Sequence, residues 1–122
     1  MTHDDVARWL DDYITAWRSY DPGAIGALFS DDAEYRYHPW EEPLHGRDAI
    51  VADWLDHRDD PETWRAEYRP WVVEGDRAVA TGASRYDDER GKRTYHNVFL
   101  IEFDPDGRCR DFREIYLIQR PT

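Results

Sequence analysis

The sequence predicts an α+β fold, in which a cone-shaped, curved and mainly antiparallel sheet and three N-terminal helices enclose a pocket. Two patterns predict these layers. Apolar residues recur at helical spacing through most of the first half, whereas apolar and polar residues alternate through nearly all of the second half. Aromatic residues make up 15% of the chain, and a curved sheet carrying many of them on its concave face suits a small-molecule pocket.

Three helices are expected before the main run of strands. The first spans 4–19, where two aspartates occupy the opening turn and favour the helix dipole. Its apolar face consists of Val6, Trp9, Leu10, Tyr13, Ile14, Trp17 and Tyr20. Asp21 and Pro22 are typical of an N-cap and a first helical residue, so a short second helix should begin there. That helix is expected to bury Ile25, Leu28 and Phe29. A third helix is expected over about 47–57.

Alternating residues predict five strands. They are expected over 33–38, 62–73, 77–86, 93–103 and 108–118. The segment Glu74-Gly75-Asp76 and the segment Asp104-Pro105-Asp106-Gly107 carry strong turn chemistry. Because short turns join strands that run in opposite directions, the last four strands should form an antiparallel meander.

Length and composition limit the classes of protein to consider. With 122 residues the chain suits a single domain over 1–122. It has no apolar run long enough for a transmembrane helix, and its N-terminus lacks the basic flank and apolar run of a signal peptide, so a cytoplasmic protein is expected. Cys109 is the only cysteine, which rules out a disulfide within the chain and a cysteine-based zinc site.

The net charge of −11 argues against nucleic acid and anionic membranes as partners, since both attract basic surfaces. No cofactor is expected, because the sequence has no glycine-rich phosphate loop. The residues that could ligate a metal in the most polar stretch are His38, Glu41, Glu42 and His45. Their spacing matches no known ligand motif, and Pro39 and Pro43 prevent a helix that would gather them, so no metal site is predicted.

Two segments carry a resemblance to a known family. They read YITAWRSYDPGAIGALFSDDAEYRYHPWEEPLHGRDAI over 13–50 and DPDGRCRDFREIYLI over 104–118. They resemble the superfamily that contains nuclear transport factor two, ketosteroid isomerase, limonene epoxide hydrolase and the SnoaL-like polyketide cyclases, the last being the closest branch. The resemblance implies the cone fold, and a homodimer that pairs through the outer face of the sheet. An exposed Trp71 beside Val73 and Leu117 would supply the apolar patch for that contact.

The resemblance also carries over single residues. Tyr13 takes the place of the isomerase tyrosine that donates to the substrate oxyanion. Tyr37 takes the place of the isomerase base, immediately before His38, and Phe99 that of the second oxyanion donor. Glu114 falls where the epoxide hydrolases and SnoaL-like cyclases place an acidic residue on the last strand. The resemblance thus implies Glu114, Tyr13 and Tyr37 as catalytic residues, and His38 joins them as the natural base to pair with Glu114 if it points inward.

Strand alternation tests this set for consistency. If Glu114 faces the cavity, so does every second residue on its strand. The substrate contacts expected on this basis are Tyr35, Tyr95, Asn97, Phe99, Phe112 and Tyr116, and Trp17 and Trp54 join them from the expected helices if the cone is open. Burial in such an aromatic cavity should raise the pKa of Glu114 toward neutrality, where it can act as a general acid or base. Strict alternation points His38 outward, unless a bulge at Pro39 turns it in.

Two functions stay open. The first is a cofactor-independent enzyme that performs isomerisation, cyclisation, hydration or dehydration on a small hydrophobic or aromatic substrate. The alternative is a non-catalytic ligand-binding or dimeric association module, in which Glu114 forms a structural ion pair with Arg85 or Arg113. The two differ in whether Glu114 meets a solvent-connected cavity.

Overall fold

The computed structural model describes residues 1–120, so the last two residues of the expected 1–122 domain lie outside the description. The helices are α1 (His3–Ser19), α2 (Pro22–Ala27), α3 (Arg47–Asp56) and the short 3-10 helix η1 (Pro61–Thr63). The strands are β1 (Phe29–Arg36), β2 (Leu44–His45), β3 (Trp64–Glu74), β4 (Arg77–Asp88), β5 (Gly91–Phe103) and β6 (Cys109–Ile118). Among the described helices, none is both long and apolar enough to span a membrane.

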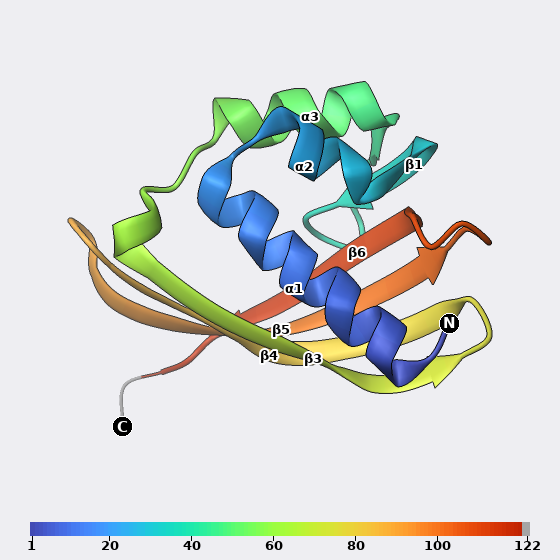
Figure 1. Ribbon diagram of the computed structural model, residues 1–122. Coiled ribbons are helices and arrows are strands. Elements are labelled where there is room, and N and C mark those ends of the chain that lie inside the picture. The colour runs from blue at the N-terminus through green and yellow to red at the C-terminus, as the bar shows by residue number, and fades with distance from the viewer. Residues whose placement is uncertain (121–122) are drawn as a thin grey trace.

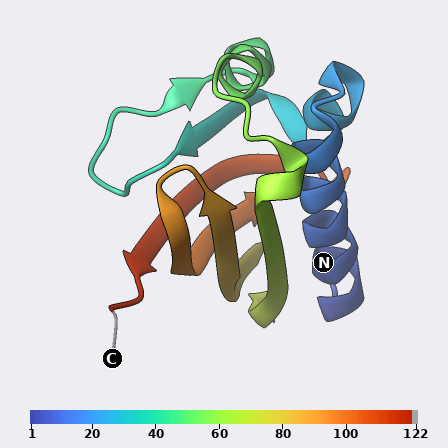
Figure 2. The ribbon, with the colours of Figure 1, turned by 90° about the vertical axis from the view of Figure 1, so that its left-hand side faces the viewer.

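The six strands form one curved sheet in the order β2-β1-β6-β5-β4-β3. Only β1 and β6 pair in parallel, and the other neighbours are antiparallel. Helix α1 lies along the concave face of this sheet, and α2 and α3 stand beside β1 (Figures 1 and 2). The predicted α+β class, the mainly antiparallel sheet and the three N-terminal helices are confirmed.

Local side-chain chemistry sets where the helices begin. The Thr2 hydroxyl accepts a hydrogen bond from the Asp5 amide, and the Asp5 carboxylate accepts one from the Thr2 amide, which completes a capping box before α1. Asp21 caps α2 and Pro22 opens it, as expected. Phe29 does not end this helix; it opens β1, which therefore begins four residues earlier than expected. Strand β2 was not predicted, since two residues are too few to show alternation.

The hydrophobic core fills one end of the cone. Trp9 of α1 packs edge to face against Phe29 and Phe103, and its indole N–H donates to the Leu28 carbonyl oxygen at 3.0 Å. The buried residues that complete this end include Val6, Leu10, Ile25, Ile101, Cys109 and Phe112. Helix α1 and strand β6 run from this filled end toward the wide end, and β5 runs the opposite way, so each contributes residues both to the core and to a pocket.

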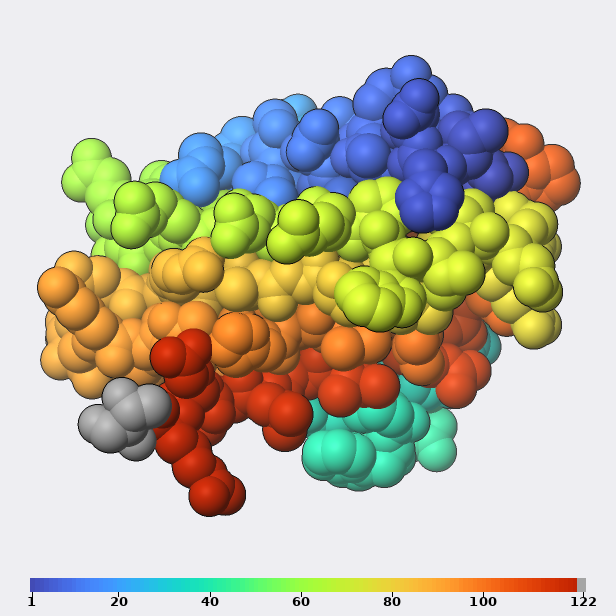
Figure 3. Space-filling model, turned by 90° about the horizontal axis from the view of Figure 1, so that it is seen from below, coloured from blue at the N-terminus to red at the C-terminus, as the bar shows by residue number. Residues whose placement is uncertain are grey.

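The outer face of the sheet, which Figure 3 shows from below, includes exposed apolar side chains. Trp71 is 73% exposed and Leu117 71% exposed, as expected for this face. The expectation that Val73 joins them is wrong. The register shifts between Pro70 and Val72, so Val72 turns outward while Val73 packs against the core. Proline interrupts a ladder and commonly sits at such a bulge, which explains the change of face.

Candidate functional site

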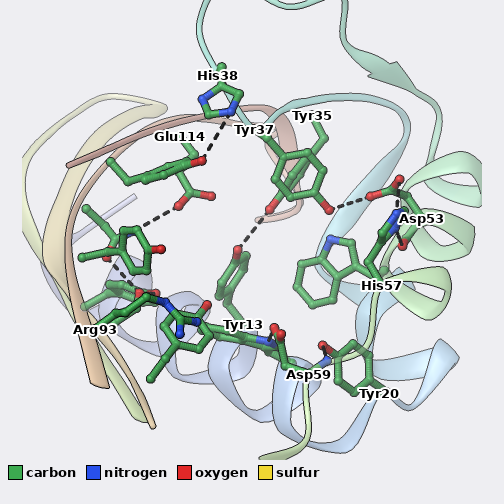
Figure 4. A pocket seen from close by; sticks show the side chains of 18 of the residues that line it. Tyr13, Tyr20, Tyr35, Tyr37, His38, Asp53, His57, Asp59, Arg93 and Glu114 are labelled. Carbon is green, nitrogen blue, oxygen red and sulfur yellow. Dashed lines mark hydrogen bonds and ion pairs between the residues drawn. The ribbon is translucent and has the colours of Figure 1, made fainter. Parts of the chain in front are cut away.

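The wide end of the cone holds a pocket of about 660 Å³ that opens partly to solvent (Figure 4). All eight tyrosines of the chain line it. Its aromatic residues are Tyr13, Trp17, Tyr20, Tyr35, Tyr37, Trp54, Tyr68, Tyr86, Tyr95 and Tyr116. Each tyrosine offers an apolar ring with a polar hydroxyl at its end, so the wall can pack a hydrophobic ligand and still bind polar groups.

Glu114 projects from β6 into this pocket, where its side chain is half-buried. One of its oxygens, Oε2, accepts a hydrogen bond from Asn97 Nδ2 at 3.0 Å. Burial penalises the charged carboxylate and raises the pKa of Glu114 to about 7, although the Asn97 bond opposes this rise. Near neutral pH the carboxyl group is therefore present in both its protonated and its ionised form.

The arginines that could have neutralised Glu114 are engaged elsewhere. Arg85 Nη1 lies 3.2 Å from Glu67 Oε1, and Arg113 Nε lies 3.1 Å from Asp111 Oδ1. Within residues 1–120, no lysine, arginine or histidine lies within 4.0 Å of the Glu114 carboxylate. The structure therefore does not contain the ion pair that a purely structural Glu114 was expected to make.

A chain of hydrogen bonds holds the Asn97 amide in place. The Ser84 hydroxyl donates to Asn97 Oδ1 at 2.9 Å, and the Tyr68 hydroxyl lies 2.6 Å from Ser84 Oγ. Because the single Ser84 hydrogen is used toward Asn97, Tyr68 must be the donor to Ser84. The Asn97 oxygen is thus occupied, so its NH₂ group faces Glu114. Three neighbouring strands, β3, β4 and β5, cooperate to present one N–H donor to the carboxylate.

Tyr13 and Tyr35 form a second polar group beside Glu114. Their hydroxyl oxygens lie 3.1 Å apart, and both side chains are almost fully buried. Burial raises the pKa of each phenol well above its ordinary value, so both stay protonated at neutral pH. Since one bond uses one hydrogen, the accepting tyrosine keeps a free O–H. The pair can therefore donate to a substrate oxygen.

Tyr37 is engaged on the opposite side of the pocket. Its hydroxyl donates to Asp53 Oδ2 at 2.6 Å, and burial together with this carboxylate raises the pKa of Tyr37. His57, the C-cap residue of α3, has Nδ1 2.9 Å from the Asp53 carbonyl oxygen, and this contact raises the pKa of His57. Sequence reasoning missed Asp53 and His57, although their separation by four residues on a predicted helix was a signal that they share a face.

His38 lies at the rim of the pocket, against the outward direction that strict alternation predicts. Strand β1 ends at Arg36, so alternation no longer governs this residue. Its Nε2 lies 3.4 Å from the Tyr116 hydroxyl and 3.8 Å from Glu41 Oε1. Its ring stacks on Trp40 with centroids 4.8 Å apart. The structure therefore brings His38 to Tyr116, and Tyr116 stands two residues from Glu114 on the same strand.

The other expected contact residues divide into two groups. Those that line the pocket as expected are Trp17, Tyr35, Trp54, Tyr95, Asn97 and Tyr116. Phe99 and Phe112 do not line it, so the expectation that they touch substrate is corrected. The ring of Phe112 stacks on that of Tyr35 with centroids 4.7 Å apart, and the ring of Phe99 packs against that of Phe112 with centroids 4.8 Å apart. They form the floor on which the tyrosine rings rest.

Charged residues complete the rim, and sequence reasoning did not identify them. Arg93 binds Asp88 through two bonds, at 2.8 and 3.1 Å, and this guanidinium lowers the pKa of Asp88 to about 2. Asp59 accepts a hydrogen bond from the Trp17 indole N–H at 3.1 Å. The described residues contain no group of three or more histidine, cysteine, aspartate or glutamate side chains placed to hold a metal ion.

Comparison with known proteins decides the family. The model of the SnoaL-like domain matches residues 10–112, which is most of the chain. The chain belongs to the SnoaL-like domain family. A solved structure similar to this SnoaL-like protein is an NTF-2 like protein of unknown function from Burkholderia xenovorans LB400. The two share 18% sequence identity and a TM-score of 0.74, with 98% of this chain and 88% of that chain covered, which supports the same fold. No curated protein matches the sequence.

Proposed function

We propose that this SnoaL-like protein is a cofactor-independent enzyme that moves a proton on a small hydrophobic or aromatic substrate. The observation that carries the proposal is the Glu114 carboxylate, which faces an aromatic pocket with one hydrogen bond and no cationic partner among the described residues. A carboxyl group that titrates near neutral pH can both accept and return a proton, which is what general acid-base catalysis requires.

The chemistry that fits these groups is proton abstraction next to a carbonyl. Ionised Glu114 takes a proton from the carbon, the C–H bond breaks, and its electron pair moves onto the carbonyl oxygen as an enolate. The free O–H of the Tyr13 and Tyr35 pair donates to that oxygen and stabilises the developing charge. Where a double bond is conjugated with the enolate, return of the proton from Glu114 to its far carbon shifts that double bond and completes an isomerisation. In a cyclisation the enolate carbon attacks a second carbonyl carbon of the same substrate, the π-bond of that carbonyl breaks onto its oxygen, and this oxygen takes the proton from Glu114.

His38 and Tyr37 take secondary roles in this proposal. His38 contacts the Tyr116 hydroxyl and reaches solvent, so it is placed to exchange protons at the rim. The hydroxyl hydrogen of Tyr37 is already donated to Asp53, so Tyr37 serves as pocket wall unless a substrate displaces that bond. Tyr13 and Tyr35 therefore stabilise negative charge better than Tyr37 does.

Exchange of carbon-bound hydrogen in heavy water tests the proposal without knowledge of the natural substrate. The probe is 2-tetralone, an aromatic ketone with acidic C–H groups, and loss of its α-proton signals is followed by NMR. Wild-type protein is expected to speed the exchange over buffer alone. Glu114→Gln should lose on the order of 10² to 10⁴-fold of that acceleration, the usual contribution of a positioned general base.

The matched control is Glu67→Gln, which removes one carboxylate from an exposed ion pair outside the pocket. It should exchange 2-tetralone at the wild-type rate. Equal rates for Glu114→Gln and wild type would contradict the assignment of Glu114. If 2-tetralone raises the melting temperature of the protein without exchanging faster than in buffer, the alternative of a non-catalytic ligand-binding module is favoured.

We further propose that two copies pair through the outer face of the sheet. The register aligns Val72, Val79 and Leu100 in one row across three strands, and Trp71 stands exposed beside it. No helix covers these strands in the view of this face (Figure 3). Apolar side chains gathered on an uncovered sheet face are typical of a contact between subunits.

Light scattering tests this pairing directly. The wild-type protein is expected to have the mass of a dimer, and Trp71→Glu the mass of a monomer, because a charge placed in an apolar contact is costly to bury. Trp40→Glu is the control, since Trp40 is 80% exposed and lies on the loop between β1 and β2. A wild-type protein that is monomeric at high concentration would refute the pairing.

A further inference from the structure

We propose that the pocket selects substrates with a positive charge, such as a protonated amine attached to an aromatic body, over neutral or anionic ones. The inference rests on the proposed function and adds the substrate class. Three features support it, namely the charges of the lining residues, the aromatic surface between them, and the binding of Arg93 at the same rim.

Carboxylates outnumber cations around the pocket. Five carboxylates and two guanidinium groups line it. The Arg93 charge is neutralised by its paired bonds to Asp88, and Arg90 is exposed on the turn between β4 and β5. The carboxylates that remain are Glu41, Asp53, Asp59 and Glu114. Among the described residues, none of these four lies within 4.0 Å of an arginine or lysine, although His38 lies 3.8 Å from Glu41 and His57 lies 3.6 Å from Asp53. Asp59 and Glu114 have no basic partner within that distance among the described residues, so the pocket carries a negative potential that repels anions.

The aromatic wall lies between these carboxylates and suits a cation. Ring faces attract cations through their quadrupole, and several rings around one cation form a cage. Arg93 already shows this arrangement at one edge, because its guanidinium lies 5.3 Å from the centroid of Tyr86 while it binds Asp88. A ligand ammonium in the centre of the pocket would find the same two elements, since tyrosine rings and Glu114 face that space (Figure 4).

Glu114 is the carboxylate best placed to respond to such a ligand. The phenols that surround it are neutral at pH 7, because burial, and to a smaller extent the Glu114 charge, raises their pKa values. These phenols are Tyr13, Tyr35, Tyr37, Tyr68, Tyr86 and Tyr116. Asn97 is uncharged, and the other ionisable groups near this wall are His38, which contacts Tyr116, and Glu41, which lies 3.8 Å from His38. A bound cation would therefore be the main positive charge facing Glu114.

This placement links binding to catalysis. A cation beside a carboxylate favours its ionised form, so an ammonium group would lower the pKa of Glu114 from about 7 and release its proton. The ionised form is the one that accepts a proton from carbon in the proposed reaction. A cationic substrate would therefore convert Glu114 into a base on arrival, whereas a neutral substrate would leave a large part of it protonated.

Isothermal titration calorimetry with three matched probes tests the inference. Tryptamine, tryptophol and indole-3-propionate share an indole ring and a two-carbon chain but end in an ammonium, a hydroxyl and a carboxylate. At pH 7 tryptamine is expected to bind about tenfold more tightly than tryptophol, with indole-3-propionate weakest. Repeating the titration in buffers of different ionisation enthalpy should show about half a proton released per tryptamine and none per tryptophol.

Variants separate this inference from the proposed function. Glu114→Gln should reduce the preference for tryptamine to threefold or less and abolish the proton release, while Glu67→Gln should retain both. Tryptophol or indole-3-propionate binding as tightly as tryptamine would overturn the charge preference. So would the failure of all three probes to bind at millimolar concentration. Either result leaves the acid-base role of Glu114 to be judged by exchange of 2-tetralone, which is uncharged.

Discussion

Glu114→Gln is expected to unfold at a temperature about 5–10 °C higher than wild type at pH 8. Glutamine has the shape of protonated glutamate and can still accept the bond from Asn97, but it has no charge to bury. Burial raises the pKa of Glu114 from 4.5 to about 7. A shift of this size lowers the free energy of unfolding by about 3 kcal/mol when the folded protein must hold the group ionised. Because the pocket admits water that relieves part of this cost, Glu114→Gln is expected to gain about 2 kcal/mol in free energy of unfolding.

The effect has a defined dependence on pH. Below pH 4.5, the pKa of this carboxyl group in the unfolded chain, the group is protonated in both the folded and the unfolded state. It then does not affect the free energy of unfolding. As the pH rises toward 7 the unfolded chain ionises while the folded protein keeps its proton, and stability falls. Above about 7 the folded protein ionises too, and the loss stays constant. Wild type and Glu114→Gln should therefore melt at similar temperatures near pH 5 and separate by pH 8.

Thermal unfolding followed by circular dichroism from about pH 5 to pH 8 measures this separation. Glu67→Gln is again the control and should show no comparable rise, because its carboxylate is exposed. A Glu114→Gln protein that melts below wild type at pH 8 would mean that the folded state uses the Glu114 charge, as a structural ion pair does.

Gly82→Ala is expected to destabilise the protein by about 3 kcal/mol or more, or to prevent folding. Gly82 of β4 faces Tyr68 of β3 in the sheet register. A Cβ added there would lie 1.9 Å from the Glu67 carbonyl oxygen and 2.6 Å from Tyr68 Cδ1. The backbone oxygen belongs to the ladder between the two strands, so it has no room to move without breaking that pairing.

Chemical denaturation with urea measures this loss, and a folded variant would give a further readout at the site. Displacement of Tyr68 should disturb the bonds through Ser84 and Asn97 that orient a donor toward Glu114. Gly23→Ala is the matched control, since an added Cβ would make only an ordinary 3.6 Å contact and alanine favours a helix. A Gly82→Ala protein as stable as wild type would show that the strands can separate locally at little cost.

The periodicity of the sequence was enough to predict the layers of the fold. Helical spacing identified α1 and α3, and alternation together with turn residues identified the four strands that close the sheet. The errors lie where periodicity carries no signal. Strand β2 has only two residues, and the register shift after Pro70 exchanges the faces of Val72 and Val73. A bulge of one residue reverses every later side chain, and the sequence marks it only by a proline.

Alternation predicted which face a side chain takes but not its depth in the cone. Phe99 and Asn97 share a face of β5, yet Phe99 lies in the filled end while Asn97 lines the pocket. The boundary depends on where α1 and the sheet converge, which is a property of the tertiary structure. The rim residues Asp53 and Asp59 were missed for a related reason, since their partners Tyr37 and Trp17 are distant in sequence.

Titration of Glu114 itself tests its acid-base role most directly. Carbon-13 NMR of the side-chain carboxyl carbons, with Glu114 assigned through the spectrum of Glu114→Gln, follows its ionisation in the wild-type protein. We expect a midpoint near pH 7, because burial in the aromatic pocket raises the pKa of Glu114 and no cation among the described residues opposes that rise. A midpoint near the ordinary value of 4.5 would contradict it, and would leave Glu114 a solvated carboxylate with no special capacity to hold a proton.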